Sequence, residues 1–259
     1  MDKLSPSGVS VIIAVNEWRP YVIRALRSIR GQQYLLEAVI VDNAPKETSV
    51  SRYVKQKFSF AKVIKSDKSN VAYHARNIGI DAALGQYIAI LDSDDEFLPN
   101  HLERSVTTLN TEMDLFMVCS SCRRVDMNGQ KKIESFESNE FTLASYIVNL
   151  GIIHSTVVFR NNGLLRYPSF KHRHDYAAWL NILSRGYRVK LIKELGSVIH
   201  ERRGSLSDLP KIYLVAKQLH ICINYSDLPL IKTCGLFAMF ILKQVKLHIK
   251  KRYETLLRK

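Results

Sequence analysis

Three aspartates are crowded directly after an apolar segment of the chain. The segment Tyr87 to Leu91 runs into the sequence LDSDDE, which contains Asp92, Asp94 and Asp95. Carboxylates at this spacing repel one another unless they share a cation, and their hard oxygen ligands suit Mg²⁺ or Mn²⁺. Such an ion usually completes its shell with substrate phosphates. The alternative, a solvated acidic turn that caps the next helix, stays open at this point.

Two further residues are candidates for a ligand site. Asp42 ends the apolar run Ala38 to Val41, and open parallel sheets bind ligands beyond the carboxyl ends of their strands. Arg76 lies in the sequence NVAYHARNIGI, which has helical spacing. A guanidinium there suits a phosphate or a nucleobase edge, although an isolated arginine is more often a surface ion-pair partner.

A third group precedes a predicted helix in the second half of the chain. His172, His174 and Asp175 lie at the start of the sequence KHRHDYAAWLNILSRGY. Two histidines and an aspartate are conceivable metal ligands. An aspartate at the start of a helix also suits a helix cap or a general base, and the residues alone do not decide.

The apolar segments that must position these residues predict an α/β fold. Apolar β-rich runs alternate with segments of helical spacing, which implies a mostly parallel central sheet with helices on both faces. A helical, basic segment, 211–259, follows the domain 1–210. Loops are expected at 126–140 and 201–210. The predicted strands are 9–15, 38–41, 61–64, 87–91, 115–119 and 156–159, and the predicted helices are 20–30, 47–58, 71–83, 102–109 and 175–184.

The composition limits the classes of protein that fit. The 259 residues are 46% hydrophobic and 24% charged, as in an ordinary globular chain. The net charge of +14 favours anionic partners, namely nucleic acid, acidic lipid or phosphorylated substrates. The apolar stretch 9–15 is too short for a secretory signal, so we expect a cytoplasmic protein. Cys119 and Cys122 are expected to be structural, because no second CxxC accompanies them.

In chain order, these segments resemble the family 2 glycosyltransferases, which adopt the GT-A fold. The opening VSVIIAVNEWRPYVIRALRSI resembles the family's first strand and helix, and VIVDN resembles its second strand with an acidic end. AYHARNIGI resembles its helix with an Arg-Asn pair, AILDSDDEFLP its DxD segment, and HRHDYAAWLNILSRGY its base motif. The match covers about residues 9–207 and implies a GT-A catalytic domain over 1–210.

The resemblance implies a role for each candidate residue. Asp42 would bind the uracil or ribose of a nucleotide sugar, and Arg76 would assist at the nucleotide. Asp92 and Asp94 would form the DxD motif that binds the donor and Mn²⁺ or Mg²⁺, with Asp94 as the direct metal ligand. Asp175 would take the proton from the acceptor hydroxyl as it attacks the anomeric carbon, and the centre would invert.

Several positions depart from the family pattern. Ala14 stands where a proline is usual, and His174 precedes the base where glutamate is common. In IHERRGSLS the family's order of Arg and then His is swapped, so that His200 comes before Arg202. Arg202 or Arg203 is therefore expected to contact the donor diphosphate, with metal ligation by His200 as the open alternative.

The last segment of the chain is expected to form a basic amphipathic helix. Leu228 to Leu242 is apolar, interrupted by Lys232 and too short for a confident membrane span. A helix at an anionic membrane surface, on the cytoplasmic face, fits this pattern. The alternative is a helix that packs on the catalytic domain and keeps a solvated basic face. The basic residues that follow Leu242 are Lys243, Lys246, Lys250, Lys251 and Arg252.

We therefore predict an inverting glycosyltransferase of the hexosyltransferase type. Its donor would be a nucleotide-diphosphate sugar such as a UDP-sugar, and its acceptor a saccharide or lipid-linked saccharide of lipopolysaccharide, capsule or a similar cell-surface glycan. No nucleic acid partner is expected, because much of the basic charge lies in the tail. The alternative is a non-catalytic basic protein of the same fold that binds nucleic acid or anionic lipid. A nucleotidylyltransferase is disfavoured, since the loop AVNEWRP contains no glycine.

Overall fold

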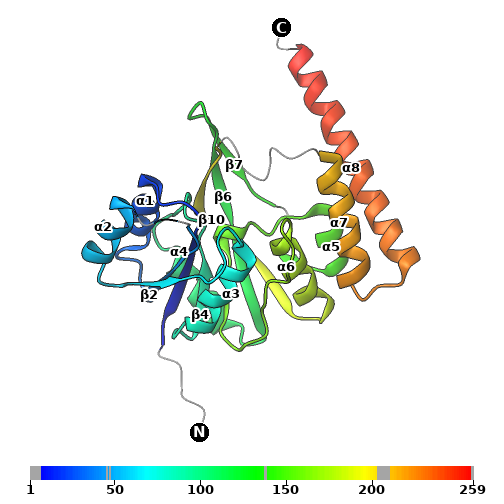
Figure 1. Cartoon of the computed structure of the whole chain (residues 1–259). Helices are drawn as coiled ribbons and strands as arrows, with labels where there is room; N and C mark the ends of the chain where they lie inside the picture. The colour runs from blue at the N-terminus through cyan, green and yellow to red at the C-terminus, as the bar shows by residue number, and fades with distance from the viewer. Residues whose placement is uncertain (1–6, 45, 47, 137–138, 203–210, 258–259) are drawn as a thin grey trace.

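The computed structural model describes residues 7–44, 46, 48–136, 139–202 and 211–257, and a ten-stranded sheet forms its centre (Figure 1). Its strands are β1 Val9–Val15, β2 Leu35–Asp42, β3 Ala61–Lys65, β4 Tyr87–Ile90, β5 Glu96–Phe97, β6 Leu115–Val125, β7 Lys131–Glu134, β8 Glu140–Phe141, β9 Val158–Arg160 and β10 Arg188–His200. The helices are α1 Pro20–Ile29, α2 Ser49–Lys57, α3 Ala72–Ala82, α4 His101–Thr111, α5 Leu143–Asn149, the 3₁₀ turn η1 His154–Thr156, α6 His174–Ser184, α7 Lys211–Tyr225 and α8 Leu230–Leu257.

The sheet is mixed, and the majority of its strands run in one direction, as predicted. Its strand order is β3-β2-β1-β4-β9-β6-β10-β5, with β7 beside β6 and β8 beside β10. β1 to β4 are parallel neighbours, and β9 is antiparallel to both β4 and β6. β6 and its parallel partner β10 therefore share the direction of the first four strands. The remaining strands, β5, β7, β8 and β9, run the opposite way.

The first half of the chain matches the predicted elements closely, and the second half contains elements that were not predicted. The expected loop 126–140 includes β7 and the first residue of β8, while the two-residue strand β5, the helix α5 and the strand β10 had no counterpart among the predictions. The strand β10 lacks a clear sequence pattern because its pairing with β6 is irregular. The register of this pair shifts on both sides of Leu195, which interrupts the alternation of side chains. Gly196 follows this irregularity, where an added Cβ would lie 2.4 Å from the His101 ring.

The core lies on both faces of the sheet, because successive residues of a strand point to opposite sides. Val11 and Ile13 of β1 pack with residues of α1, α2 and α4, whereas Ile12 packs with residues of α3, α5 and α6. α7 and the first half of α8 join this second cluster, and Phe237 and Phe240 of α8 are buried in it. The second half of α8 extends beyond the rest of the molecule (Figure 1).

Candidate active site

Two adjoining cavities open where β1, β4, β6 and β10 end. The first cavity is the one lined by Arg76, Asp94 and Arg202, and the second is the one lined by Tyr146, Arg173 and Tyr176. Each has a volume of about 470 Å³. Six residues line both cavities, namely Asp92, Asp95, Arg124, His154, Asp175 and Ile199. Of the six residues predicted to act in binding or catalysis, five line the first cavity: Arg76, Asp92, Asp94, Asp175 and Arg202.

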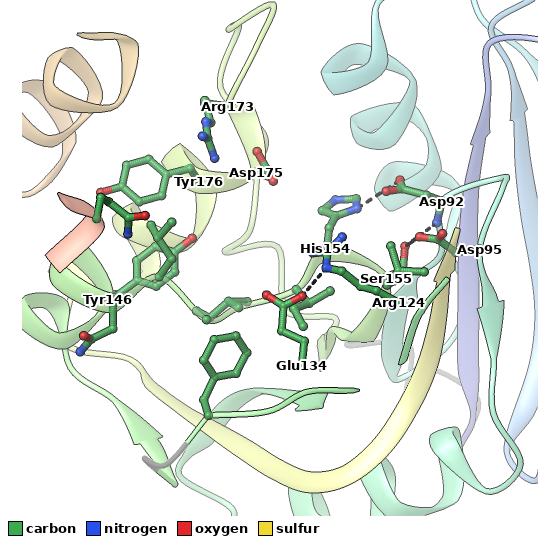
Figure 2. Close-up of a pocket in the computed structure, with 18 residues that line it drawn as sticks. Asp92, Asp95, Arg124, Glu134, Tyr146, His154, Ser155, Arg173, Asp175 and Tyr176 are labelled. Atoms are coloured by element: carbon green, nitrogen blue, oxygen red, sulfur yellow. Dashed lines mark hydrogen bonds and ion pairs between the residues drawn. The ribbon is translucent and has the colours of Figure 1, made fainter. Parts of the chain in front are cut away.

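Asp92 lies two residues after the end of β4 and is the most strongly paired carboxylate of the site. Its Oδ1 accepts a hydrogen bond of 2.6 Å from Arg76 Nη2 and lies 3.2 Å from His154 Nδ1. Burial would raise the pKa of this carboxyl, but the charges of His154 and Arg76 lower it well below its usual range. Asp92 is therefore ionised at neutral pH. Figure 2 shows its carboxylate directed at His154.

Asp94 lies deeper than a surface turn would place it and is paired with a different arginine. Its Oδ2 contacts Arg202 Nε, while its backbone carbonyl accepts a hydrogen bond of 2.6 Å from Arg24. Burial and the charge of Asp92 raise the pKa of Asp94, and Arg202 opposes the shift. Mutual repulsion between the two carboxylates thus persists in the folded chain.

Asp95 lines both cavities, and its carboxylate also holds the turn after β4 in place. Its Oδ2 accepts a hydrogen bond of 2.6 Å from Ser155 Oγ, and its Oδ1 accepts one of 3.0 Å from the His200 backbone N–H. These bonds tie the turn after β4 to η1 and to the end of β10. His200 Nε2 lies 2.7 Å from Glu96 Oε1, so its imidazole is already engaged.

Arg76 is buried in the site, contrary to the surface ion pair that an isolated arginine suggests. Besides Asp92 it contacts His174 Nε2, and its guanidinium lies 5.7 Å from the Tyr167 ring centroid. Burial and the charge of Arg76 lower the pKa of His174 to about 3. The His174 ring is therefore neutral, and its Nε2 accepts the hydrogen bond from the guanidinium.

Asp175 lies in the first turn of α6 and lines both cavities. Burial would raise the pKa of its carboxyl, but its pKa is lowered below the usual aspartate value, and the backbone N–H of Tyr176 and the charge of Arg76 contribute to this at neutral pH, where the His174 ring is uncharged. A carboxylate that stays ionised and faces a cavity is suited to accept a proton from a bound hydroxyl.

Asp42 ends β2 as predicted but does not line either cavity. Its Oδ1 accepts hydrogen bonds from Trp18 Nε1 at 2.9 Å and from the Ala44 N–H at 3.1 Å, and Oδ2 lies 3.2 Å from Lys65 Nζ. The adjacent Asn43 donates a hydrogen bond of 2.6 Å to Asn16, which does line the first cavity.

The oxygen ligands at the end of β4 fit a divalent cation that is completed by a substrate. In the described residues, no three His, Cys, Asp or Glu side chains form a group able to hold a metal. Mg²⁺, however, is usually bound through one or two carboxylates and substrate phosphates. Asp92 and Asp94 supply such carboxylates, and a shared cation would relieve the repulsion that raises the pKa of Asp94.

His154 and Ser155 are site residues that the sequence patterns did not single out. They belong to η1, immediately before β9, and both face the turn that carries the aspartates. The signal was present in LGIIHSTVVF, where polar residues interrupt an apolar run just before a strand. Arg203, the alternative to Arg202, lies outside the described residues. Cys119 and Cys122 are buried free thiols of β6.

Comparisons with known proteins identify the family of this chain. The family model described as "Glycosyl transferase family 2" matches residues 10–174. The chain is 27% identical over 202 residues to the Escherichia coli protein WfaP, named as a UDP-Glc:alpha-D-GlcNAc-diphosphoundecaprenol beta-1,3-glucosyltransferase, covering 77% of this chain and 79% of WfaP. It is 25% identical to the succinoglycan biosynthesis protein ExoO of Rhizobium meliloti, covering 77% of this chain but 62% of ExoO.

The fold is also similar to a solved structure. The crystal structure of S. aureus TarS residues 1–349 in complex with UDP-GlcNAc superposes with a TM-score of 0.70 at 18% sequence identity. The match covers 90% of this chain and 71% of the TarS chain. At this identity the likeness establishes the GT-A fold, and the chemistry must be argued from the cavity itself.

Proposed function

This chain belongs to glycosyl transferase family 2, and we propose that it transfers a sugar from a UDP-sugar to a hydroxyl of a saccharide acceptor, with inversion of the anomeric centre. The observation that carries the proposal is the convergence of Asp92, Asp94 and Asp175 on one cavity. A non-catalytic protein that binds nucleic acid or anionic lipid has no use for buried carboxylates in its site. The anionic residues in this cavity favour the enzyme.

Asp175 is the proposed base. Its carboxylate would accept the proton of the acceptor hydroxyl as that oxygen attacks the anomeric carbon, which makes a weak nucleophile more reactive. The low pKa of Asp175 keeps the carboxylate ionised and ready for this role at neutral pH. Its place on the wall between the two cavities suits a donor in the first cavity and an acceptor in the second.

The donor would be held by residues of the first cavity and its rim. The Arg202 guanidinium, now paired with Asp94 and Tyr21, can exchange a carboxylate for a diphosphate oxygen. Arg76 would act by holding Asp92 in place from its buried position. Asp42 is proposed to help bind the uridine. It is next to Asn43, whose side chain donates a hydrogen bond to Asn16 at the edge of the first cavity.

Asp94, together with Asp92, would hold Mn²⁺ or Mg²⁺ against the diphosphate. The bound cation would neutralise the charge that develops on the departing nucleotide. Arg202, because it contacts Asp94, is placed to share that task from the protein side.

The acceptor is proposed to be a lipid-linked saccharide of a cell-surface glycan. The support comes from relatives: the name of WfaP gives a diphosphoundecaprenol acceptor, and that of ExoO gives succinoglycan biosynthesis. A membrane-bound acceptor calls for an enzyme that works at the membrane surface. No helix within the described part of the chain combines the length and the apolar character needed to cross a bilayer.

We propose that α8 attaches the protein to the cytoplasmic face of an anionic membrane. The face of α8 opposite the buried Phe237 and Phe240 is apolar and exposed, with Ile231 89%, Leu242 61% and Ile249 62% accessible. Lysines lie along one side of this apolar stripe at Lys232, Lys243 and Lys246. Residues 211–259 contain ten Lys or Arg and two Asp or Glu, so they carry +8 of the net charge. A second copy of such a basic helix would be repelled, whereas anionic lipid would be attracted.

The function can be tested with a panel of nucleotide sugars. We expect hydrolysis of a UDP-sugar, or transfer to a lipid-linked acceptor, that requires Mn²⁺ or Mg²⁺ and stops with excess chelator. Calorimetry should detect binding of uridine diphosphate in the presence of the metal. If no nucleotide diphosphate binds and no nucleotide sugar is consumed, the proposal fails and the non-catalytic alternative takes its place.

A further inference from the structure

The second cavity has the features of a saccharide subsite. Figure 2 shows Asp92 and Asp95 on one side of it, Tyr146 and Tyr176 on the other, and Asp175 between them. The two tyrosine rings stack with centroids 5.3 Å apart and an interplanar angle of 30°. Both side chains belong to the buried core, with Tyr146 3% and Tyr176 2% exposed, so they form an apolar wall of the cavity. Asn149 and Gln244 add amide groups suited to hydroxyls.

Arg173 differs from the other arginines that line the two cavities, because each of those has an ion-pair partner. Arg124 contacts Glu134, Arg76 contacts Asp92, and Arg202 contacts Asp94. Within the described residues, Arg173 has no ion-pair partner. Its Nε is buried without a hydrogen-bond partner, and its side chain extends toward Asp175 and Tyr176 (Figure 2).

The backbone at Arg173 also holds the side chain in an unusual place. Arg173 precedes α6 with φ of 61°, in the left-handed region that a non-glycine residue enters only when its surroundings impose it. This conformation directs the side chain into the cavity beside the proposed base. A buried Nε–H without a hydrogen-bond partner is unfavourable, because this polar group has lost its contact with water and gained none in exchange. The arrangement is explained if a ligand supplies the anion.

Resting on the proposed function, we propose that Arg173 binds an anionic group of the acceptor, a phosphate or a carboxylate, in the second cavity. The planar guanidinium can donate two parallel hydrogen bonds to either group. The sugar that carries the anion would then lie in the second cavity, which Tyr146 and Tyr176 help to line, with a hydroxyl within reach of Asp175. The enzyme would thus select acceptors by negative charge as well as by the sugar itself.

Ligand-observed NMR with saturating uridine diphosphate, which fills the first cavity, tests this assignment. The probes are glucose 1-phosphate, glucuronate and glucose, which share the same hexose ring configuration and differ in charge. We expect one or both anionic probes to bind at least about 10-fold more tightly than glucose, since a charged hydrogen bond contributes on that order. The stronger of the two identifies phosphate or carboxylate as the natural group.

Variants of Arg173 decide whether this residue causes the preference. Arg173→Gln should remove the preference, and Arg173→Lys should keep part of it, because lysine retains the charge but loses the planar fork. Arg185→Gln, at the exposed end of the same helix, should change nothing. Equal binding of the three probes, or an unchanged preference in Arg173→Gln, overturns the proposal. Failure of uridine diphosphate itself to bind would instead refute the donor proposal on which this one rests.

Discussion

Replacing Asp175 by asparagine tests the proposed base most directly. Asparagine keeps the size and hydrogen-bonding reach of the side chain but cannot accept the proton of the attacking hydroxyl. Asp175 is the second residue of α6, and Arg173 occupies the cap position before the helix. The substitution therefore removes a charge from the first turn and leaves the helix cap unchanged.

The expected effects on rate and on stability differ greatly in size. A positioned base contributes about 10² to 10⁴-fold to the rate, so transfer should fall by that order. Losing a negative charge in the first turn of a helix destabilises by about 0.3 to 1 kcal/mol. Glu103→Gln is a matched control, because Glu103 occupies the first turn of α4 and does not line either cavity. It should reduce stability similarly and leave the rate unchanged.

The assay is steady-state transfer to a competent acceptor, combined with urea unfolding of each variant. The low pKa of Asp175 adds a second expectation, since a base is active only when deprotonated. Protonation of this residue should not limit the wild-type rate between pH 5 and 8, above the usual aspartate pKa of about 3.9. An Asp175→Asn variant within a few-fold of wild type, or no more impaired than Glu103→Gln, would remove Asp175 from the mechanism.

Four further outcomes are expected. Asp94→Ala should abolish metal-dependent turnover, and full activity of the wild type in excess chelator would contradict the metal assignment. Asp42→Ala should weaken uridine diphosphate binding about 10-fold or more by calorimetry, because hydrogen bonds to a charged group contribute about 1.5 to 3 kcal/mol; unchanged affinity would place the nucleotide elsewhere. Ile231→Ser with Leu242→Ser should release the chain from phosphatidylglycerol vesicles at unchanged stability, and retained binding would refute attachment through α8. Burial lowers the pKa of His101 to about 3, so the unfolded state binds more protons between about pH 6.5 and 3. Stability should therefore fall as the pH drops through that window, by up to about 1.4 kcal/mol per pH unit, and His101→Gln should flatten this slope in urea titrations.

The sequence patterns predicted the parallel half of the sheet better than the rest for a physical reason. β1 is buried on both faces and reads as a continuous apolar run, VSVIIAV, bounded by polar residues. β10 alternates between buried and exposed residues only in part, since its register against β6 shifts near Leu195. α5 is a seven-residue helix, too short for a 3.6-residue period to be distinctive.

For the site, residue type and strand position singled out Asp92 and Asp94, which line the first cavity, but the pairing among side chains was not predictable. Asp92 and Asp175 are separated by more than 80 residues in the sequence. Only in the folded chain do both carboxylates lie close enough to His154 and Arg76 to be affected by them. Arg76 illustrates the limit: an isolated arginine in a helix gives no sign that it will be buried against a carboxylate and a neutral histidine.

The position of α8 connects the two proposals about the acceptor. Gln244 of α8 lines the second cavity, whereas Ile231, Leu242 and Ile249 lie on the exposed side of the same helix. If that exposed stripe rests on the membrane, the cavity proposed for the acceptor is separated from the lipid surface by one helix, whose diameter is about 10 Å. A sugar joined to lipid through a diphosphate extends from the bilayer by a short, negatively charged segment. Arg173 lines the same cavity as Gln244, so the loss of its guanidinium should affect anionic acceptors more than neutral ones.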